Sequence, residues 1–368
     1  MPHSTHRLSY GFSLVEIMIG MVIGMLGIIV MMQIFALAEG QKRATTGGGD
    51  ALNSGAIALY GVQRDIRQAG YGFSALNLFN CNVTMPSGAT IPLVPVSINP
   101  AAVPAGDANS DTLLVMYGNA NGTPQGNVIN ALAGPVYTVS TPSSFAVGDR
   151  VIAVPAACAA NLLVDQVNAV AANVTVATGV AGVATLYNLG QLPKVLGYAI
   201  RNGNLTVCDY FANDCSIAGS VGDPTIWVPI ASNIVSLRAQ YGHDTLTAAI
   251  TFATPPVPLP NYVVDTYDQT TPTAVTAFPT PCGWARIPAV RVVLAARSGQ
   301  YEKDLVTTAA PVWEGSTVVA GSATGANNPT ALPIDLTANT DWQHYRYKLF
   351  QTVVPIRNIA WMGVQSGC

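Results

Sequence analysis

The sequence predicts an α+β protein in which a long N-terminal membrane helix precedes a β-rich, mainly antiparallel globular head. An apolar run from Ile17 to Ala38 contains no charged residue, and its length of about 33 Å as a helix is enough to cross a bilayer. From Asn77 onward, short runs rich in Val, Thr and Tyr alternate with clusters of Gly, Pro and Asn. That alternation is typical of strands joined by turns.

The chain as a whole is weakly charged. Only 10% of its 368 residues are Asp, Glu, Lys or Arg, while 50% are hydrophobic; soluble domains usually carry about 25% charged residues. The net charge of -3 gives no indication of a basic face that would bind nucleic acid, so no nucleic-acid partner is expected.

These features divide the chain into four segments: a polar leader over residues 1–11, a transmembrane helix over 12–38, a stem with an amphipathic helix over 39–72, and the β-rich head over 73–368. The stem contains three consecutive glycines in the run TTGGGD, from Thr45 to Asp50. Each glycine costs a helix about 1 kcal/mol relative to alanine. We therefore expect a break there, with helix resuming at Asp50 as the N-cap.

The second half of the stem is predicted to pack on the head. Its apolar residues recur at steps of three to four residues or their multiples, as in an amphipathic helix, and Gly70-Tyr71-Gly72 then ends the helix. The predicted buried stripe comprises Leu52, Ala56, Leu59, Ile66 and Ala69.

Six strands of the head are predicted from their composition. The Ala- and Val-rich stretch 164–186 also alternates enough to form strands, whereas the stretches at about 255–282 and about 315–333 are expected to be loops because of their Pro, Thr, Gly and Asn content. The six predicted strands are Thr112–Tyr117, Arg150–Val154, Lys194–Arg201, Ile234–Tyr241, Ile287–Ala296 and Tyr345–Val354.

The six cysteines are dispersed, and none belongs to a C-x-x-C pair, so a zinc site is not indicated. Outside the cytoplasm they predict up to three disulfides, with free buried thiols as the alternative. Cys208 and Cys215 are the expected pair, because the intervening DYFAND can close a hairpin. The pairing of the other four stays open: Cys81, Cys158, Cys282 and Cys368.

No motif of the sequence indicates catalysis. His243-Asp244 in YGHD is more typical of a turn after a strand than of a catalytic dyad. The run from Asp107 to Asp111 resembles the start of a calcium loop, but Thr112 stands where that loop needs glycine and no glutamate closes it. We therefore expect no enzyme activity, no cofactor and no metal.

The segment YRYKLF near the C-terminus leaves two interpretations open. On a strand, Tyr345, Tyr347 and Leu349 share one face, and Arg346, Lys348 and Phe350 share the other. The segment is either a core face beside a partly solvated face or a strand edge that binds a partner.

A carboxylate, Glu16, stands at the start of the apolar run. Within a bilayer it costs a few kcal/mol unless it is paired, so its presence requires a function. A secretory signal peptide, with Ala36 and Ala38 imitating a cleavage site, is the competing interpretation, but the run is too long and contains an acid. Gly20 and Gly24 form G-x-x-x-G, which either favours close packing of helices or is ordinary membrane-helix glycine.

The run Gly11-Phe12-Ser13-Leu14-Val15-Glu16, followed by the long apolar helix, resembles the class III signal of type IV prepilins and type II secretion pseudopilins. The resemblance implies a pilin-like fold and cleavage after Gly11 by a membrane prepilin peptidase. It implies that Phe12 becomes the mature N-terminus, normally N-methylated. It also implies that Glu16 meets the N-terminal amine of a neighbouring subunit in the filament core, where Gly20 and Gly24 favour bundling.

Several segments of the head resemble the PilW family of type IV pilus minor pilins, in order along the chain. The closing WxxYRY…PxRN block is the most specific. The helix-end segment matches at Arg64, Asp65, Arg67, Ala69, Gly70 and Tyr71, and Cys81 follows it. The matching segments are YGVQRDIRQAGYGF (60–73), SDTLLVMYG (110–118), RIPAVRVVLAARS (286–298) and DWQHYRYKLFQTVVPIRN (341–358).

The PilW resemblance implies a low-abundance structural subunit of the complex that primes pilus assembly and sits at the tip. The implied partners are other minor pilins, a PilY-type tip protein, the major pilin, the inner-membrane assembly platform and the prepilin peptidase. The head would be periplasmic while the helix spans the bacterial inner membrane, and would reach the cell surface after assembly. The alternatives are a minor pseudopilin of type II secretion or a surface adhesin on a pilin stem.

Overall fold

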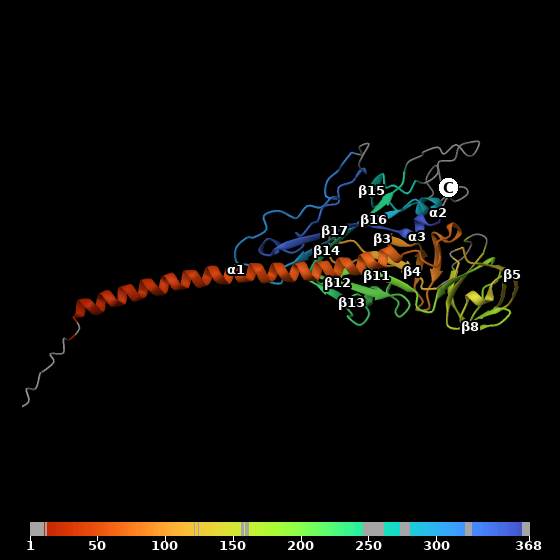
Figure 1. Cartoon of the computed structure of the whole chain (residues 1–368), viewed down its shortest axis with the longest axis horizontal. Helices are drawn as coiled ribbons and strands as arrows, with labels where there is room; N and C mark the ends of the chain where they lie inside the picture. The colour runs from red at the N-terminus through yellow and green to blue at the C-terminus, as the bar shows by residue number, and fades with distance from the viewer. Residues whose placement is uncertain are drawn as a thin grey trace, which may run out of the picture. The chain divides into compact units, whose positions relative to one another are not determined.

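A computed structural model describes residues 11, 13–120, 122–123, 125–155, 158, 162–245, 261–272, 280–320 and 326–362. It confirms the α+β class: a long apolar helix, α1 (Leu14–Gln68), precedes a mostly antiparallel β-rich head (Figure 1). The chain divides into two compact units, Met1–Gly49 and Asp50–Cys368.

The helix α1 is helical throughout Thr45–Gly49, so the break predicted at the three glycines was wrong. Asp50 lies inside the helix and is not its N-cap. The cost of about 1 kcal/mol for each glycine is a weak preference, which continuing backbone hydrogen bonds can outweigh. The boundary between the two compact units nevertheless falls directly after this glycine run.

The second half of α1 packs on the head through small side chains. Its buried face holds Ala51, Ala58 and Val62. Leu52 is 49% exposed and Ala56 is exposed, so these two positions of the predicted stripe were wrong. Small side chains on this face let the helix approach the sheets closely. Leu59 is half-buried, and Ile66 and Ala69 are buried as predicted.

One sheet of the head closes into a small barrel, which forms the right-hand part of the head in Figure 1. Its strand order is β2-β1-β8-β7-β10-β5-β6-β9, and a further β8–β9 pairing closes the ring. The barrel has its own core, which includes Tyr137, Phe145 and Val167. The strands are β1 (Cys81–Thr84), β2 (Thr90–Leu93), β5 (Asn127–Ala133), β6 (Val136–Val139), β7 (Arg150–Val154), β8 (Leu162–Val170), β9 (Val174–Val176) and β10 (Thr185–Gly190).

Two antiparallel sheets build the rest of the head, in the orders β13-β12-β11-β4-β3 and β15-β14-β16-β17. Buried residues of both sheets and of α1 belong to one hydrophobic cluster. The strands are β3 (Val96–Ile98), β4 (Leu113–Tyr117), β11 (Lys194–Arg201), β12 (Asn204–Asp209), β13 (Val228–Ser232), β14 (Ile234–His243), β15 (Thr266–Asp268), β16 (Ala289–Arg297) and β17 (Tyr347–Pro355).

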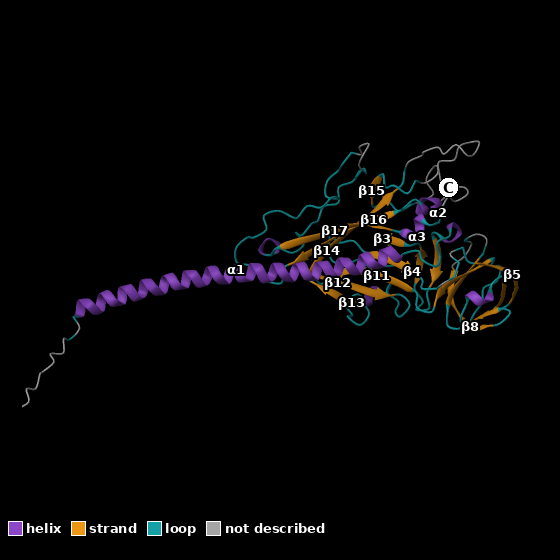
Figure 2. Cartoon of the chain, viewed as in Figure 1, coloured by secondary structure: helices purple, strands orange, loops and turns teal. Residues whose placement is uncertain are grey.

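Short helices lie before, between and after these strands (Figure 2). They are α2 (Thr280–Ala285) and α3 (Arg357–Ala360), with 3-10 turns at Leu76–Leu78, Pro142–Ser144, Ala218–Ser220 and Trp342–His344.

All six predicted strands are present, as β4, β7, β11, β14, β16 and β17, with ends that differ by at most two residues. The stretch 164–186 forms strands as predicted, within β8, β9 and the start of β10. The predicted loop at 255–282 was wrong in part, because β15 and the start of α2 lie within it. Its positions 255–260 and 273–279 lie outside the described residues.

Two disulfides are present in the described part of the chain. Cys208 and Cys215, the pair expected from the sequence, are bonded with Cα atoms 6.0 Å apart, and Cys81 is bonded to Cys158 with Cα atoms 5.6 Å apart. Cys282 is also disulfide-bonded. Cys368 lies outside the described residues.

Gly55 marks the closest approach between α1 and the four-stranded sheet. A Cβ atom built on Gly55 would lie 2.1 Å from Cε2 of Phe350, in β17. The Phe350 ring therefore occupies the space that any side chain at position 55 would need.

Gly55→Ala is expected to destabilise the full-length protein by about 1–3 kcal/mol through overpacking. The matched control is Gly61→Ala in the same helix, where a Cβ meets nothing within 4 Å. That control should gain up to about 1 kcal/mol from helix propensity. Urea unfolding of both variants in detergent measures the difference, and equal stabilities would contradict the packing described here.

Candidate functional site

The first half of α1 is apolar on every face. Its large apolar side chains between Leu14 and Leu37 keep from 48% (Ile29) to 75% (Phe35) of their surface exposed. The most apolar stretch of the helix has no buried residue. A helix that is hydrophobic all round is stable in a membrane or inside a bundle of helices. This segment is therefore compatible with a membrane anchor, and it requires lipid or other helices to cover it.

The residues predicted to act in processing and assembly lie at the start of this helix. Glu16 is in its first turn, and it forms no ion pair within the part of the chain that the structure describes. Gly11 is exposed, and Phe12 lies outside the described residues. A Cβ built on Gly20 or Gly24 meets nothing within 4 Å. These two positions are therefore open to the approach of another helix.

Asp65 fixes the second half of α1 to the five-stranded sheet. Its carboxylate is 1% exposed and accepts hydrogen bonds from the hydroxyls of Tyr117 (3.0 Å), in β4, and Tyr198, in β11. Arg64 forms an ion pair with it at 3.0 Å. Burial, and then the nearby Asp65 carboxylate, raise the pKa of both tyrosine hydroxyls well above the usual value. Both tyrosines thus remain neutral donors to Asp65.

Asn358 holds the C-terminal end of α1. Its side-chain Nδ2 donates to the carbonyl oxygens of Gln68 (3.1 Å) and Ala69 (2.9 Å) at the end of the helix, where Gln68 also accepts the backbone N–H of Tyr71. Asn358 belongs to α3, directly after β17. The helix-end segment 60–73 and the closing block 341–358, far apart in the sequence, therefore meet at this point.

A groove lies where these two segments meet. It consists of a hollow of about 330 Å³ beside Arg67 and Arg357 and a hollow of about 470 Å³ that extends to Tyr187 of the barrel. Both hollows are lined by Tyr71, Asn358 and Trp361. We call this the α1–α3 groove. Its lining comes from four parts of the head: the end of α1 with the turn after it, the β4–β5 connection, α3 with the residues directly after it, and Tyr187 of the barrel.

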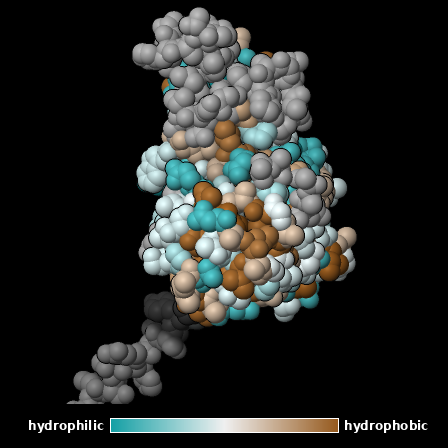
Figure 3. All heavy atoms as spheres, turned by 90° about the vertical axis from the view of Figure 1, so that its right-hand side faces the viewer, coloured by the Kyte–Doolittle hydropathy of each residue, from teal (hydrophilic) through white to brown (hydrophobic). Residues whose placement is uncertain are grey.

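Two aromatic side chains of the groove are exposed: Trp361 has 76% of its surface accessible, and Tyr71 has 37%. Figure 3 shows the face of the head that is at the right-hand side of Figure 1, where apolar atoms gather among polar ones. Exposed aromatic side chains beside arginines are the composition found at the energetic centres of protein interfaces. The α1–α3 groove is thus a candidate protein-binding surface.

The segment YRYKLF contributes β17, an edge strand whose only sheet partner among the described strands is β16. Tyr347 and Leu349 pack on the cluster around Trp313, while Phe350 packs toward α1 on the other face. The predicted core face is therefore only half-buried, and Phe350, expected on the partly solvated face, packs on the core as well. The binding of a partner to this edge stays a prediction.

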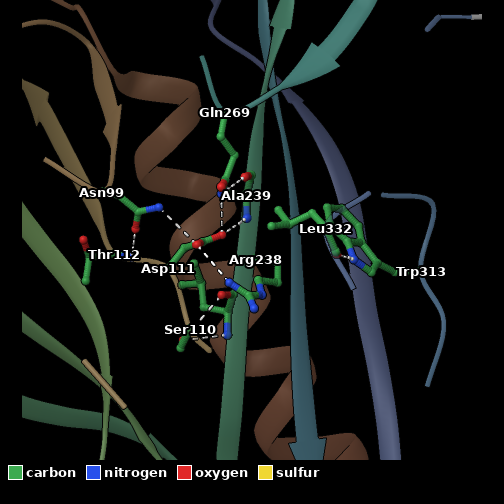
Figure 4. Close-up of polar contacts among 10 residues, drawn as sticks. Asn99, Ser110, Asp111, Thr112, Arg238, Ala239, Gln269, Trp313 and Leu332 are labelled. Atoms are coloured by element: carbon green, nitrogen blue, oxygen red, sulfur yellow. Dashed lines mark hydrogen bonds and ion pairs between the residues drawn. The ribbon is translucent and has the colours of Figure 1, made fainter. Parts of the chain in front are cut away.

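The acidic run from Asp107 to Asp111 organises the fold. Asp107 accepts backbone N–H bonds from Asn202 (3.0 Å) and Gly203 (2.7 Å). Asp111 is buried, and Figure 4 shows its carboxylate among Asn99, Arg238, Ala239 and Gln269. The donor nitrogens of these four residues lie 2.8 to 3.2 Å from the Asp111 carboxylate oxygens. Donors surround both carboxylates, so their oxygens already have partners.

His243 also has a structural partner. Its Nε2 lies 3.1 Å from the Asp268 carboxylate, across the β14–β15 pair. Within the described residues, no group of three or more His, Cys, Asp and Glu residues is placed to hold a metal. Asp244 hydrogen-bonds to the backbone of Tyr262 instead of to His243.

Three residues of these surfaces carried no individual prediction from the sequence. Nothing in the sequence around Gly55 distinguishes it from other glycines, and Asn358 was identified only as part of the closing block. Trp361 lies three residues after that block. The one signal for it in the sequence was that it is an aromatic residue near Arg357. What each contacts depends on the meeting of distant segments.

A family model described as "Type IV Pilus-assembly protein W" (PilW) matches residues 209–358, less than half of the chain. The match covers β14, β16 and β17 and ends at Asn358. The match suggests a protein of type IV pilus assembly, in a family of structural components. No curated protein and no solved structure matches the chain.

Asn358→Asp is expected to destabilise the protein by about 1–3 kcal/mol, because the carbonyls of Gln68 and Ala69 lose the Asn358 donor and face a carboxylate. The matched control is Asn53→Asp, an exposed position of α1 that should change stability by less than about 0.5 kcal/mol. Denaturant midpoints of the full-length variants give both values. A similar small effect at both positions would show that Asn358 does not hold the helix end.

Proposed function

We propose that this chain is a minor pilin of a type IV pilus, a structural subunit of the complex that primes assembly and occupies the tip. The observation that carries the proposal is the first half of α1, apolar on all faces and uncovered. The Gly11-Phe12 junction precedes it, and a head matched by the PilW family model follows it.

The physical cycle follows from the helix. In the membrane, lipid covers its apolar surface, and the head lies in the periplasm. In a filament, the stems of other subunits replace lipid, so the helix leaves the bilayer only by entering a bundle of similar helices. Gly20 and Gly24 permit close approach within that bundle, because a Cβ at either position has open space around it. The assembly platform, the major pilin, other minor pilins and a PilY-type tip protein are the proposed partners.

Glu16 selects the register in which the stem enters the bundle. A buried carboxylate is tolerated only when it is paired. After cleavage behind Gly11, Phe12 carries a free amine one helical turn from Glu16, and a staggered neighbour carries another. Pairing with the neighbour's amine fixes the axial position of the subunit.

Cleavage behind Gly11 is expected to leave Phe12 as the mature N-terminus, and Gly11→Val should leave the precursor uncut in the inner membrane because the bulkier side chain blocks the peptidase. N-terminal sequencing of the membrane and pilus fractions tests both statements. Gly24→Val, a glycine change remote from the junction, is the control and should still be cut. A mature protein that starts after Ala38 would show a signal peptide and exclude a minor pilin.

Glu16→Ala is expected to keep cleavage and membrane insertion, since removing a charge from a membrane segment makes insertion easier. It should reduce the co-purification of other minor pilins, and Glu16→Asp should lie between the parent and Glu16→Ala. The readouts are the recovery of partner pilins and the number of pili per cell. Wild-type assembly of Glu16→Ala would exclude charge pairing as the mechanism.

A further inference from the structure

Two cationic side chains of the α1–α3 groove have no partner of opposite charge among the described residues. Arg67 and Arg357 both line the smaller hollow, and both are exposed. Neither guanidinium takes part in an ion pair or in a side-chain hydrogen bond among the residues that the structure describes. By contrast, Arg64 in the same helix pairs with Asp65 at 3.0 Å, and Arg346 pairs with Glu302 at 2.6 Å.

An exposed aromatic wall separates the two hollows. Trp361 lines both and keeps 76% of its surface accessible. Its support is rigid, because the preceding Asn358 is held by the carbonyls of Gln68 and Ala69 and Ile359 is 1% exposed. A large apolar side chain on a rigid support loses little conformational entropy when a partner covers it.

The larger hollow has no charged side chain, and its lining mixes polar and apolar residues. Ser74, Asn77 and Gln125 contribute polar groups, and Leu76 contributes an apolar one. The combined groove therefore has positive charge at one end, an aromatic residue shared by both hollows, and neutral polar and apolar groups at the other end. A single small anion would use only the arginine end, whereas a peptide can use the whole length.

We propose that the α1–α3 groove binds a segment of another protein that carries acidic side chains next to an aromatic or aliphatic residue. The acidic side chains would pair with Arg67 and Arg357, and the apolar residue would pack on Trp361 and Tyr71. This proposal rests on the proposed function only in that the partner would be another protein of the pilus assembly. Charge complementarity and the shape of the groove carry it.

Binding is tested with full-length protein in detergent and a fluorescently labelled random copolymer of Glu and Tyr, followed by anisotropy. The copolymer of Lys and Tyr serves as the control probe. We expect the acidic copolymer to bind, the basic copolymer to bind at least tenfold more weakly, and the affinity for the acidic one to fall as salt rises. Equal binding of both copolymers would overturn the proposal.

Variants locate the binding. Trp361→Ala and the double variant Arg67→Glu/Arg357→Glu should each weaken acidic-copolymer binding at least tenfold. The matched controls are Leu192→Ala, which truncates a side chain that is 72% exposed outside the groove, and Lys303→Glu, an exposed charge reversal elsewhere. Both controls should bind within twofold of the parent. Equal losses in controls and groove variants would overturn the assignment to this groove.

A lipid surface is the other source of negative charge and is tested in the same way. Phosphatidylglycerol vesicles should compete with the acidic copolymer no better than phosphatidylcholine vesicles do. Selective competition by phosphatidylglycerol that is lost in Arg67→Glu/Arg357→Glu would assign the groove to membrane binding and overturn the proposal.

The result of the copolymer experiment can be distinguished from the result of the N-terminal sequencing that tests the minor pilin function. A mature N-terminus at Phe12 together with no copolymer binding would contradict the groove proposal alone. A start after Ala38 together with groove-dependent copolymer binding would exclude a minor pilin but keep the binding site.

Discussion

The burial of Asp65 is the constraint on which the arrangement of the head depends. A carboxylate that is 1% exposed is stable only where donors surround it, and here the donors come from β4 and β11. The helix can therefore take only the rotation and the height that bring Asp65 between Tyr117 and Tyr198. Apolar contacts would tolerate a slip of the helix, whereas this polar contact does not. The end of α1 is also held by polar contacts, because Asn358 donates hydrogen bonds to two of its carbonyl groups.

The helix α1 contributes to two surfaces of different chemistry. The first half of α1 is uniformly apolar and suits lipid or other helices, while its last turn contributes Arg67 to a charged and aromatic groove. Lipid or other helices can cover the first surface, whereas the α1–α3 groove is a candidate surface for binding another protein. The match of the PilW family model to residues 209–358 covers the strands that lead to α3.

The sequence predicted local structure well and long-range contacts poorly. The strands Arg150–Val154 and Lys194–Arg201 were predicted with their observed ends, because composition and flanking turns determine them locally. The barrel was not predicted, since its closure depends on the pairing of β8 with β9, which no local pattern encodes. At the candidate site, the segments were identified as blocks. The joint groove was missed, because the approach of Arg67 to Arg357 and Trp361 exists only after the head has folded.

The contact between Gly55 and Phe350 has a consequence for how this sequence can change over time. The ring of Phe350 fills the place of a side chain at position 55, so an enlarged residue 55 is accommodated only in a lineage that has already reduced residue 350. Substitution at either site is thereby conditional on the other, although the two positions lie far apart in the sequence. Recombination that exchanges only one of the two segments between diverged sequences would separate compatible residues and produce heads that fold poorly.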